Sequence, residues 1–321
     1  MSIVLNGAWK PFRREFEEYM SAFRKHAKRV EKEATLAHMI ESARIREIEL
    51  ANRALQIRNM KIARRHRILS SLPAVDYVNK HSQKSRLRQP GTTIWLRDTP
   101  QYISWFASSA STCLYCYGIP GSGKSVLSAS LVDRLLESNV QDGSSPVFYY
   151  YCDYAEVQSL QPVSLIASLL QQAIQTFPLD RFDENFLCLL DHGQRLPALS
   201  ECMTCFVELL QEFQTAYIVI DGIDELKSED QLFVLNLIDH LLRPATVTTK
   251  IFATSRIGEY PVHNSLKRHT CLKIAKELID KDMSHFISEE IESIAQKNPA
   301  LNNRSLKQDI NDALVDGANG M

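Results

Sequence analysis

The sequence predicts an α/β fold, a doubly wound parallel sheet preceded by a long α-helical arm. Three observations support this fold class. Short apolar runs alternate with helix-like segments over roughly the last two thirds of the chain. A glycine-rich loop joins the first of these runs to a helical segment. The stretch from Pro11 to about Leu69 contains no glycine and no internal proline, which favours an uninterrupted helical arm.

The composition is that of an ordinary soluble protein of about two domains. The chain has 321 residues, of which 45% are hydrophobic and 23% are charged. We expect no membrane span and no secretory leader, because the apolar runs are short and the first residues lack a basic start with a long apolar core. Seven cysteines, an odd number, favour reduced thiols over a disulfide framework. We therefore expect a cytoplasmic protein.

Charge is distributed unevenly along the chain. Residues 1–90 carry 20 Lys/Arg and 9 Asp/Glu, a net charge of +11. Residues 91–321 carry 17 Lys/Arg and 29 Asp/Glu, a net charge of −12. This asymmetry predicts attraction between the two halves, or between the basic half and an acidic partner. It also supports a division into two domains.

Residues 1–70 are expected to form the helical arm. Apolar residues recur there at spacings of three and four, which places them on one helix face: Phe12, Phe16, Tyr19, Phe23, Ala27, Val30, Ala34 and Ala37. A helical hairpin and one long, coiled-coil-like helix both fit this pattern. Residues 71–91 are polar and basic with two prolines, which predicts a linker. A short helix should follow, capped by Asp98 or Thr99 with Pro100 in its first turn.

The alternating pattern then predicts five strands and the helices between them. The predicted strands are Cys113–Tyr117, Val147–Cys152, Tyr217–Asp221, Ile251–Ser255 and Thr270–Ile274. The predicted helices include Lys124–Glu137, Pro162–Thr176, Met203–Phe213 and Gln231–Leu242. Short apolar runs of this kind are typical of buried parallel strands, which right-handed crossovers join.

The run GIPGSGKS has the G-x-x-x-x-G-K-S spacing of a loop that wraps a triphosphate. Its glycines let backbone N–H groups close on phosphate oxygens, and the positive end of the following helix adds to this attraction. Lys124 would reach the β- and γ-phosphates, and the Ser125 hydroxyl would bind Mg²⁺. The predicted nucleotide-binding residues are Gly118, Ile119, Pro120, Gly121, Ser122, Gly123, Lys124, Ser125 and Val126. The predicted cofactors are ATP or ADP and Mg²⁺.

The ends of two further predicted strands carry candidate residues for Mg²⁺ binding and ATP hydrolysis. The run YIVIDGIDE delivers Asp221 to the carboxyl end of a strand, where ligands gather in open α/β sheets, so Asp221 is the expected Mg²⁺ partner. Either Asp224 or Glu225 could orient an attacking water, with a surface acidic turn as the alternative. The run KIFATSR ends in Arg256, which could sense the third phosphate or merely pair with an acid.

Taken in order, GIPGSGKS, YIVIDGIDEL and KIFATSR resemble the NACHT class of signal-transduction (STAND) NTPases. The likeness is greatest to fungal nucleotide-binding receptors whose NTPase is called nephrocystin-like, and GTTIWLRDTPQYISW, YYYCDY and SLIASLLQQ resemble the same subgroup. The resemblance covers about residues 85–321. The arm, with WKPFRREFEEYM, resembles the tail of a helical domain that often precedes this NTPase in fungi. The fold that the resemblance implies is a P-loop NTPase with strand order 5-1-4-3-2.

The resemblance also implies a function. It implies an ATP/ADP-dependent signalling switch with slow Mg²⁺-dependent hydrolysis, part of a fungal receptor of the innate-immunity or incompatibility type. It further implies nucleotide-dependent self-association, and protein partners for the arm and for repeats that follow. In related switches the stretch before the first strand covers the base, which points to Gly91–Trp95. A winged-helix segment follows the NTPase in the family, so we expect residues 92–321 to stop just before it, as in a fragment or shortened gene product.

Other functions remain open at this point. A scaffold could hold nucleotide without cleaving it, and a metabolic kinase or motor ATPase is a less favoured alternative. A GTPase is disfavoured because no N-K-x-D motif follows the loop. The pairs Cys113/Cys116 and Cys202/Cys205 are expected to be core residues rather than a zinc site. The run KIARRHR is expected to be a solvated helix face, so no specific nucleic acid is expected as a partner.

Overall fold

The computed structural model describes residues 2–142, 145–181, 190, 196–243, 245–258, 260–297 and 303–317. The chain divides into two compact units, Met1–Ala63 and Arg64–Met321. Among the described helices, none combines the length and the hydrophobicity that crossing a membrane requires.

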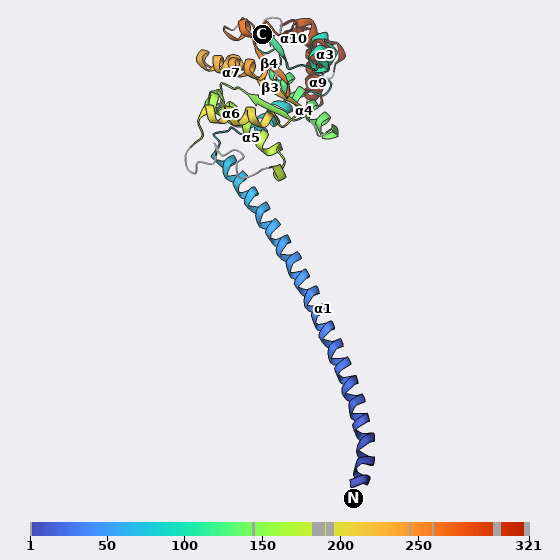
Figure 1. Cartoon of the computed structure of the whole chain (residues 1–321). Helices are drawn as coiled ribbons and strands as arrows, with labels where there is room; N and C mark the ends of the chain where they lie inside the picture. Colours follow the sequence, from blue (N-terminus) through green and yellow to red (C-terminus); the bar gives the residue numbers. More distant parts are fainter. Residues whose placement is uncertain are drawn as a thin grey trace. The chain divides into compact units, whose positions relative to one another are not determined.

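The N-terminal arm is one continuous helix. Helix α1 extends from Ser2 to Ser71, so the described residues of the first unit are helical throughout (Figure 1). The alternative of a helical hairpin was therefore wrong. Many of its apolar side chains are exposed, among them Phe16, Tyr19 and Phe23 at 56%, 74% and 68%. The exposed stripe follows from the sequence, because residues three and four apart lie on one helix face.

The second unit is built on a five-stranded parallel sheet. Its strands are β1 (Thr112–Gly118), β2 (Val147–Tyr151), β3 (Thr215–Asp221), β4 (Thr248–Arg256) and β5 (Thr270–Lys273). Their order is β2-β3-β4-β1-β5, and all neighbouring pairs are parallel. This is the expected order 5-1-4-3-2 counted from the other edge, and every predicted strand is present.

Helices cover both faces of this sheet. On one face the end of α1 packs with α5 (Pro162–Thr176), α6 (Leu199–Leu210), α7 (Ser228–Leu241) and α8 (Val262–Leu266). On the other face lie α2 (Tyr77–Arg86), α3 (Pro100–Ala107) and α4 (Lys124–Asp142). Two further helices, α9 (Lys276–Lys297) and α10 (Arg304–Gly317), pack against each other. The alternation of strands and helices therefore forms the expected layered domain (Figure 1).

Alternate residues of the strands supply the two cores. Cys113 belongs to the core under α5–α8, whereas Cys116 belongs to the core under α2–α4. Both are fully buried. Side chains of a strand point alternately to the two faces of its sheet, so this C-x-x-C pair is divided between the two cores.

Two helix starts are set by short polar contacts. The Thr99 hydroxyl accepts the backbone N–H of Tyr102 at 3.3 Å, so Thr99 rather than Asp98 caps α3. The Glu201 carboxylate accepts the backbone N–H of Ala198 at 2.7 Å, and α6 begins four residues before the predicted start. Such caps satisfy N–H groups that the helix leaves without partners.

The expected linker, residues 71–91, differs from the prediction because it contains helix α2, packed on α4 and β2. Lys80 and Lys84 both contact the Asp153 carboxylate, at 3.0 Å and 3.2 Å. Two of the basic residues that suggested a linker are thus paired with acids of the α/β unit. These ion pairs account for part of the predicted attraction between the basic residues 1–90 and the acidic residues 91–321.

Candidate nucleotide-binding site

The predicted phosphate loop lies between the end of β1 and the start of α4. Gly121 and Gly123 have φ angles of 79° and 77°, in the left-handed region that favours glycine. The loop is tightly folded at its start, because a Cβ on Gly118 would lie 2.6 Å from the Ser122 hydroxyl. At Gly123 no atom lies within 4 Å of such a Cβ, so this side of the loop is open. The glycines therefore shape a turn whose open face is available to a ligand.

Lys124 begins α4 and turns back over the loop. Its Nζ donates to the carbonyl oxygens of Gly118 at 3.0 Å and Ile119 at 2.7 Å. Burial lowers the pKa of Lys124, while the charges of Asp224 and Asp221 act to raise it. The ammonium is thus held among loop carbonyls and acidic groups, in a position from which it can reach a phosphate.

Asp221 lies at the end of β3 and is 1% exposed. Its Oδ1 accepts hydrogen bonds from the hydroxyls of Ser128 at 2.7 Å and Thr254 at 2.8 Å. The Thr254 hydroxyl also accepts the backbone N–H of Gly222 at 2.9 Å. This network joins β3 to β4 and α4, and it holds the carboxylate beside the helix that carries Ser125. Ser128 was not among the residues predicted from the sequence, although its position one turn after Lys124 could have suggested it.

Asp221 and Ser125 offer the oxygen ligands that Mg²⁺ prefers. No group of three or more His, Cys, Asp or Glu suited to a metal occurs in the described part of the chain. A magnesium ion here would therefore depend on these two side chains together with phosphate oxygens and water, which is its usual ligand set beside a triphosphate.

The three candidate catalytic residues form one cluster. Asp224 Oδ1 accepts the backbone N–H of Arg256 at 3.0 Å, and Asp224 Oδ2 lies 3.3 Å from Arg256 Nε. Glu225 Oε1 lies 3.9 Å from Arg256 Nη2, and its Oε2 accepts the backbone N–H of Tyr154 at 2.6 Å. The side chains of Asp224 and Glu225 are 3% and 19% exposed. The end of β4 and the turn after β3 thus meet through these charges.

Burial raises the pKa of both Asp224 and Glu225. For Asp224 the contacts with Arg256 and the charge of Lys124 act in the opposite direction. For Glu225 the Tyr154 N–H and the Arg256 charge oppose the effect of burial. Carboxylates whose pKa is raised by burial beside a cation are typical of functional sites.

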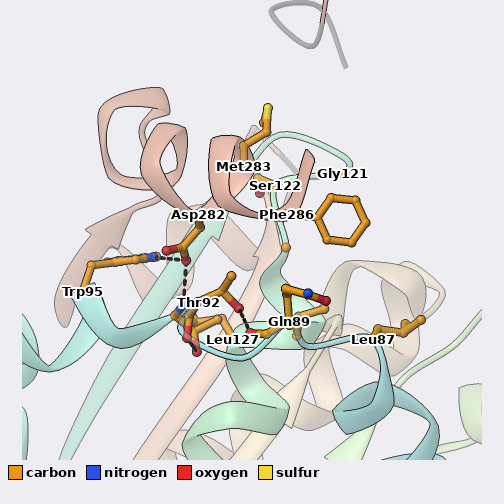
Figure 2. A pocket seen from close by; sticks show the side chains of 13 residues that line it. Leu87, Gln89, Thr92, Trp95, Gly121, Ser122, Leu127, Asp282, Met283 and Phe286 are labelled. Atoms are coloured by element: carbon orange, nitrogen blue, oxygen red, sulfur yellow. Dashed lines mark hydrogen bonds between the residues drawn. The ribbon is translucent and has the colours of Figure 1, made fainter. Parts of the chain in front are cut away.

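A pocket of about 280 Å³ opens beside the phosphate loop (Figure 2). It is lined by Leu87, Gln89, Thr92, Thr93, Trp95, Gly121, Ser122, Gly123, Val126, Leu127, Asp282, Met283 and Phe286. The wall is mostly apolar with few polar groups, as in pockets that bind small organic molecules. Three of the lining residues belong to Gly91–Trp95, the segment suggested for the base. The contribution of α9 was missed, since nothing in the local pattern of residues 276–297 indicates a ligand.

The comparison with known families decides the membership of this chain. Residues 91–256, just over half of the 321, match the model of the family described as Nephrocystin 3, N-terminal. The chain belongs to this family. The matched residues contain the phosphate loop, Asp221 and the Asp224–Glu225–Arg256 cluster, whereas α9 lies beyond them. A search of curated proteins found no significant match.

Several solved structures share a distant likeness with this nephrocystin 3 N-terminal relative. The ORC1 protein of Aeropyrum pernix, in complex with DNA, is 14% identical with a TM-score of 0.37, covering 71% of this chain and 58% of that one. The Walker-type ATPase of Pyrococcus abyssi is 18% identical with a TM-score of 0.38, at coverages of 65% and 64%. A Drosophila ORC chain bound to DNA is 15% identical with a TM-score of 0.34, at 54% and 39%.

The chain spans less than two thirds of each of these three structures. The fold assignment therefore depends on the strand order and the loop described above. The parallel sheet, the G-x-x-x-x-G-K-S loop and the family membership together make the chain a nucleotide-binding P-loop NTPase.

Proposed function

We propose that this chain is an ATP/ADP-dependent signalling switch of the NACHT (STAND) type, which resets by slow, Mg²⁺-dependent ATP hydrolysis. The observation that carries the proposal is the cluster in which Arg256 contacts both Asp224 and Glu225 at the carboxyl edge of the sheet, where Lys124 lies. The finer assignment to a fungal receptor of the innate-immunity or incompatibility type rests on the motif resemblance. Self-association and protein partners are part of the same proposal.

The two acidic residues of the cluster have different tasks in this proposal. One oxygen of Asp224 accepts the backbone N–H of Arg256, and the other pairs with the guanidinium of the same residue. Because the Asp224 side chain is only 3% exposed, we assign it the task of holding Arg256 in place. Glu225 is more exposed, and its Oε1 lies 3.9 Å from the guanidinium, beyond hydrogen-bond distance. In our proposal this oxygen accepts a proton from the attacking water. We therefore assign water positioning to Glu225.

Arg256 is the element that responds to the third phosphate. Its side chain is 41% exposed and is held by two carboxylates. A γ-phosphate would attract the same guanidinium, so the contacts of Arg256 would differ between ATP and ADP. Bound Mg²⁺, held by Ser125 and Asp221, would neutralise charge that develops on the phosphates. The difference at Arg256 would then reach the Asp224 carboxylate and the end of β4.

The test compares Glu225→Gln with Asp224→Asn in single-turnover reactions with labelled ATP. Glu225→Gln should slow cleavage by about 10²–10⁴-fold and leave ATP affinity unchanged, because the amide keeps the shape but cannot take the proton. Asp224→Asn should have a smaller effect on cleavage. Glu229→Gln makes the same chemical change at an exposed neighbouring position and should behave as wild type.

The same variants distinguish a switch from a scaffold. A trapped ATP state should increase self-association of Glu225→Gln, measured as particle size with ATP and with ADP. If the wild-type chain binds ATP and does not cleave it, the non-hydrolysing scaffold is the better function. If cleavage collapses while ATP-bound and ADP-bound particles are equal in size, the residue assignment stands and the switch does not.

A further inference from the structure

Helix α9 contacts the segment before β1 at two points. Asp282 Oδ2 accepts the backbone N–H of Thr93 at 2.6 Å and the indole N–H of Trp95 at 3.1 Å. His285 Nε2 donates to the carbonyl oxygen of Pro90 at 2.8 Å. Residues three apart on a helix lie on the same face. The same face of α9 therefore holds both ends of the segment Pro90–Trp95, which we call the base segment.

The base segment has a backbone that needs such support. Gly91 has a φ angle of 87°, and Thr93, a β-branched residue, has a φ angle of 66°. Left-handed geometry is rare for β-branched residues and persists where surrounding contacts impose it. Thr93 is 7% exposed, and its hydroxyl donates to the Ser130 hydroxyl at 2.6 Å. Contacts from α9 and α4 thus impose the conformation of this residue.

The pocket beside the phosphate loop is formed jointly by these elements. Thr92 and Trp95 of the base segment form part of its wall, and Met283 and Phe286 of α9 form another part. In Figure 2 the Asp282 carboxylate lies between the helix and the segment, with its hydrogen bonds drawn to both partners. The glycines of the phosphate loop complete the wall. Without α9 in this place, the pocket would lose the side chains of Met283 and Phe286 and the contacts that support the base segment.

We propose that Asp282 and His285 are positioning residues for the base of the nucleotide, so that base binding and docking of α9 stabilise each other. This inference rests on the proposed function, because it takes the pocket as the place of the base while the phosphates bind the loop. Coupling of this kind is reciprocal: a docked α9 raises base affinity, and a bound base holds α9 in place. Phosphates without a base would bind the loop and leave the space between α9 and the base segment empty. They should therefore not take part in the coupling.

The test uses the full chain with two probes, ATP and inorganic tripolyphosphate, each with Mg²⁺. Asp282→Ala should weaken ATP binding by about 10–100-fold, since it removes two hydrogen bonds to a charged group. His285→Ala removes one bond and should weaken ATP by about 2–10-fold. Tripolyphosphate affinity should stay within about twofold in both variants, because this probe has no base. Glu290→Ala, an exposed change on the same helix, should bind both probes as wild type does.

Two further measurements separate positioning from a general loss of structure. Asp282→Asn keeps an acceptor oxygen at the same place and should recover most of the ATP affinity. Amide hydrogen exchange should show ATP, but not tripolyphosphate, protecting residues 276–297, and Asp282→Ala should lose this protection. The inference is overturned if Asp282→Ala binds ATP like wild type, or if it loses tripolyphosphate to the same extent. A wild-type chain that binds neither probe would instead refute the proposed function, and the inference with it.

Discussion

The two sides of the candidate site are built in different ways. The phosphate side consists of one continuous loop, Gly118–Ser125, and the ends of two neighbouring strands. The base side is assembled from segments far apart in the chain: the Asp282–Thr93 hydrogen bond joins residues 189 positions apart. The loop expected to bind phosphate is thus a contiguous stretch of sequence, whereas the shape of the base pocket depends on tertiary contacts.

Lys124→Ala should have the strongest effect and weaken the binding of both ATP and tripolyphosphate by about 100-fold or more. The substitution removes a cation that would donate to phosphate oxygens, and hydrogen bonds to charged groups contribute about 1.5–3 kcal/mol each. Calorimetric titration with the two probes would measure it. Equal ATP affinity in wild type and variant would show that the loop does not hold phosphate.

The choice of base should produce the next largest effect, with ATP preferred over GTP by about tenfold or more. No N-K-x-D motif, the motif with which GTPases read guanine, follows the phosphate loop. Competition between the two nucleotides, with tripolyphosphate as a base-free reference, would measure the preference. Similar affinities for ATP and GTP would contradict the proposed adenine-nucleotide switch.

Gly91→Ala should reduce the free energy of unfolding by about 1–2 kcal/mol, the usual disadvantage of a left-handed conformation for a residue with a Cβ. The φ angle of Gly91 is 87°, and a Cβ there would lie 3.3 Å from His285 Nε2. Chemical denaturation would measure the loss, and ATP affinity should fall while tripolyphosphate affinity does not. Gly258→Ala is a matched control for the strain alone, because its φ is 80° and no atom lies within 4 Å of a Cβ. If Gly258→Ala lowers ATP affinity as much as Gly91→Ala does, the loss does not come from the base side of the site.

Phe286→Ala should weaken ATP by about fivefold, close to 1 kcal/mol, because the ring lines the pocket but is 44% exposed. Tripolyphosphate should bind as before. Ile294→Ala, a change at a 50% exposed position of the same helix outside the pocket lining, should leave both affinities unchanged. A loss of tripolyphosphate affinity in Phe286→Ala would contradict the separation between the base side and the phosphate side.

The smallest expected effect concerns α2, which leads into the pocket residues Leu87 and Gln89. Burial alone would raise the pKa of Asp153, but the Ala155 N–H and the two lysines of α2 together lower it. A lowered pKa means that the carboxylate stabilises the fold above its unfolded pKa, and that this contribution disappears as pH falls through the folded value. Asp153→Asn should therefore lower the free energy of unfolding at pH 7 by about 0.5–1 kcal/mol.

The pH dependence of that effect is its check. The difference between wild type and Asp153→Asn should shrink in denaturation experiments as pH falls from the unfolded pKa of Asp153 through its lower folded value, because the wild-type carboxyl loses its charge over that range. Asp98→Asn is a control, since Asp98 is 74% exposed and lies 3.7 Å from Arg97. A difference that stays constant from pH 7 to pH 3 would mean that the charge of Asp153 does not hold α2.

Much of the sheet could be predicted because buried parallel strands are short apolar runs, as in VFYYY of β2, where every residue is buried. The strand order came from the resemblance, and the phosphate loop from a motif whose residues are contiguous. Helix α2 could not be predicted from its own residues, because its lysines pair with an acid 69 and 73 positions away. Asp282 was missed for the same reason. The proposed division of roles between Asp224 and Glu225 also needed the structure, since only burial and distance distinguish two adjacent acids.

The division of Cys113 and Cys116 between the two cores has a consequence for the reactivity of the chain. Burial raises the pKa of both thiols, so neither supplies the thiolate that alkylating reagents and oxidants attack. Strand β1, which carries them, lies inside the sheet between β4 and β5. A reagent can reach these sulfurs only when the helical layer on one face or the other separates from β1. The two cysteines are therefore a pair of internal chemical labels, one for each layer, and the rate at which each is modified reports how often its own layer opens.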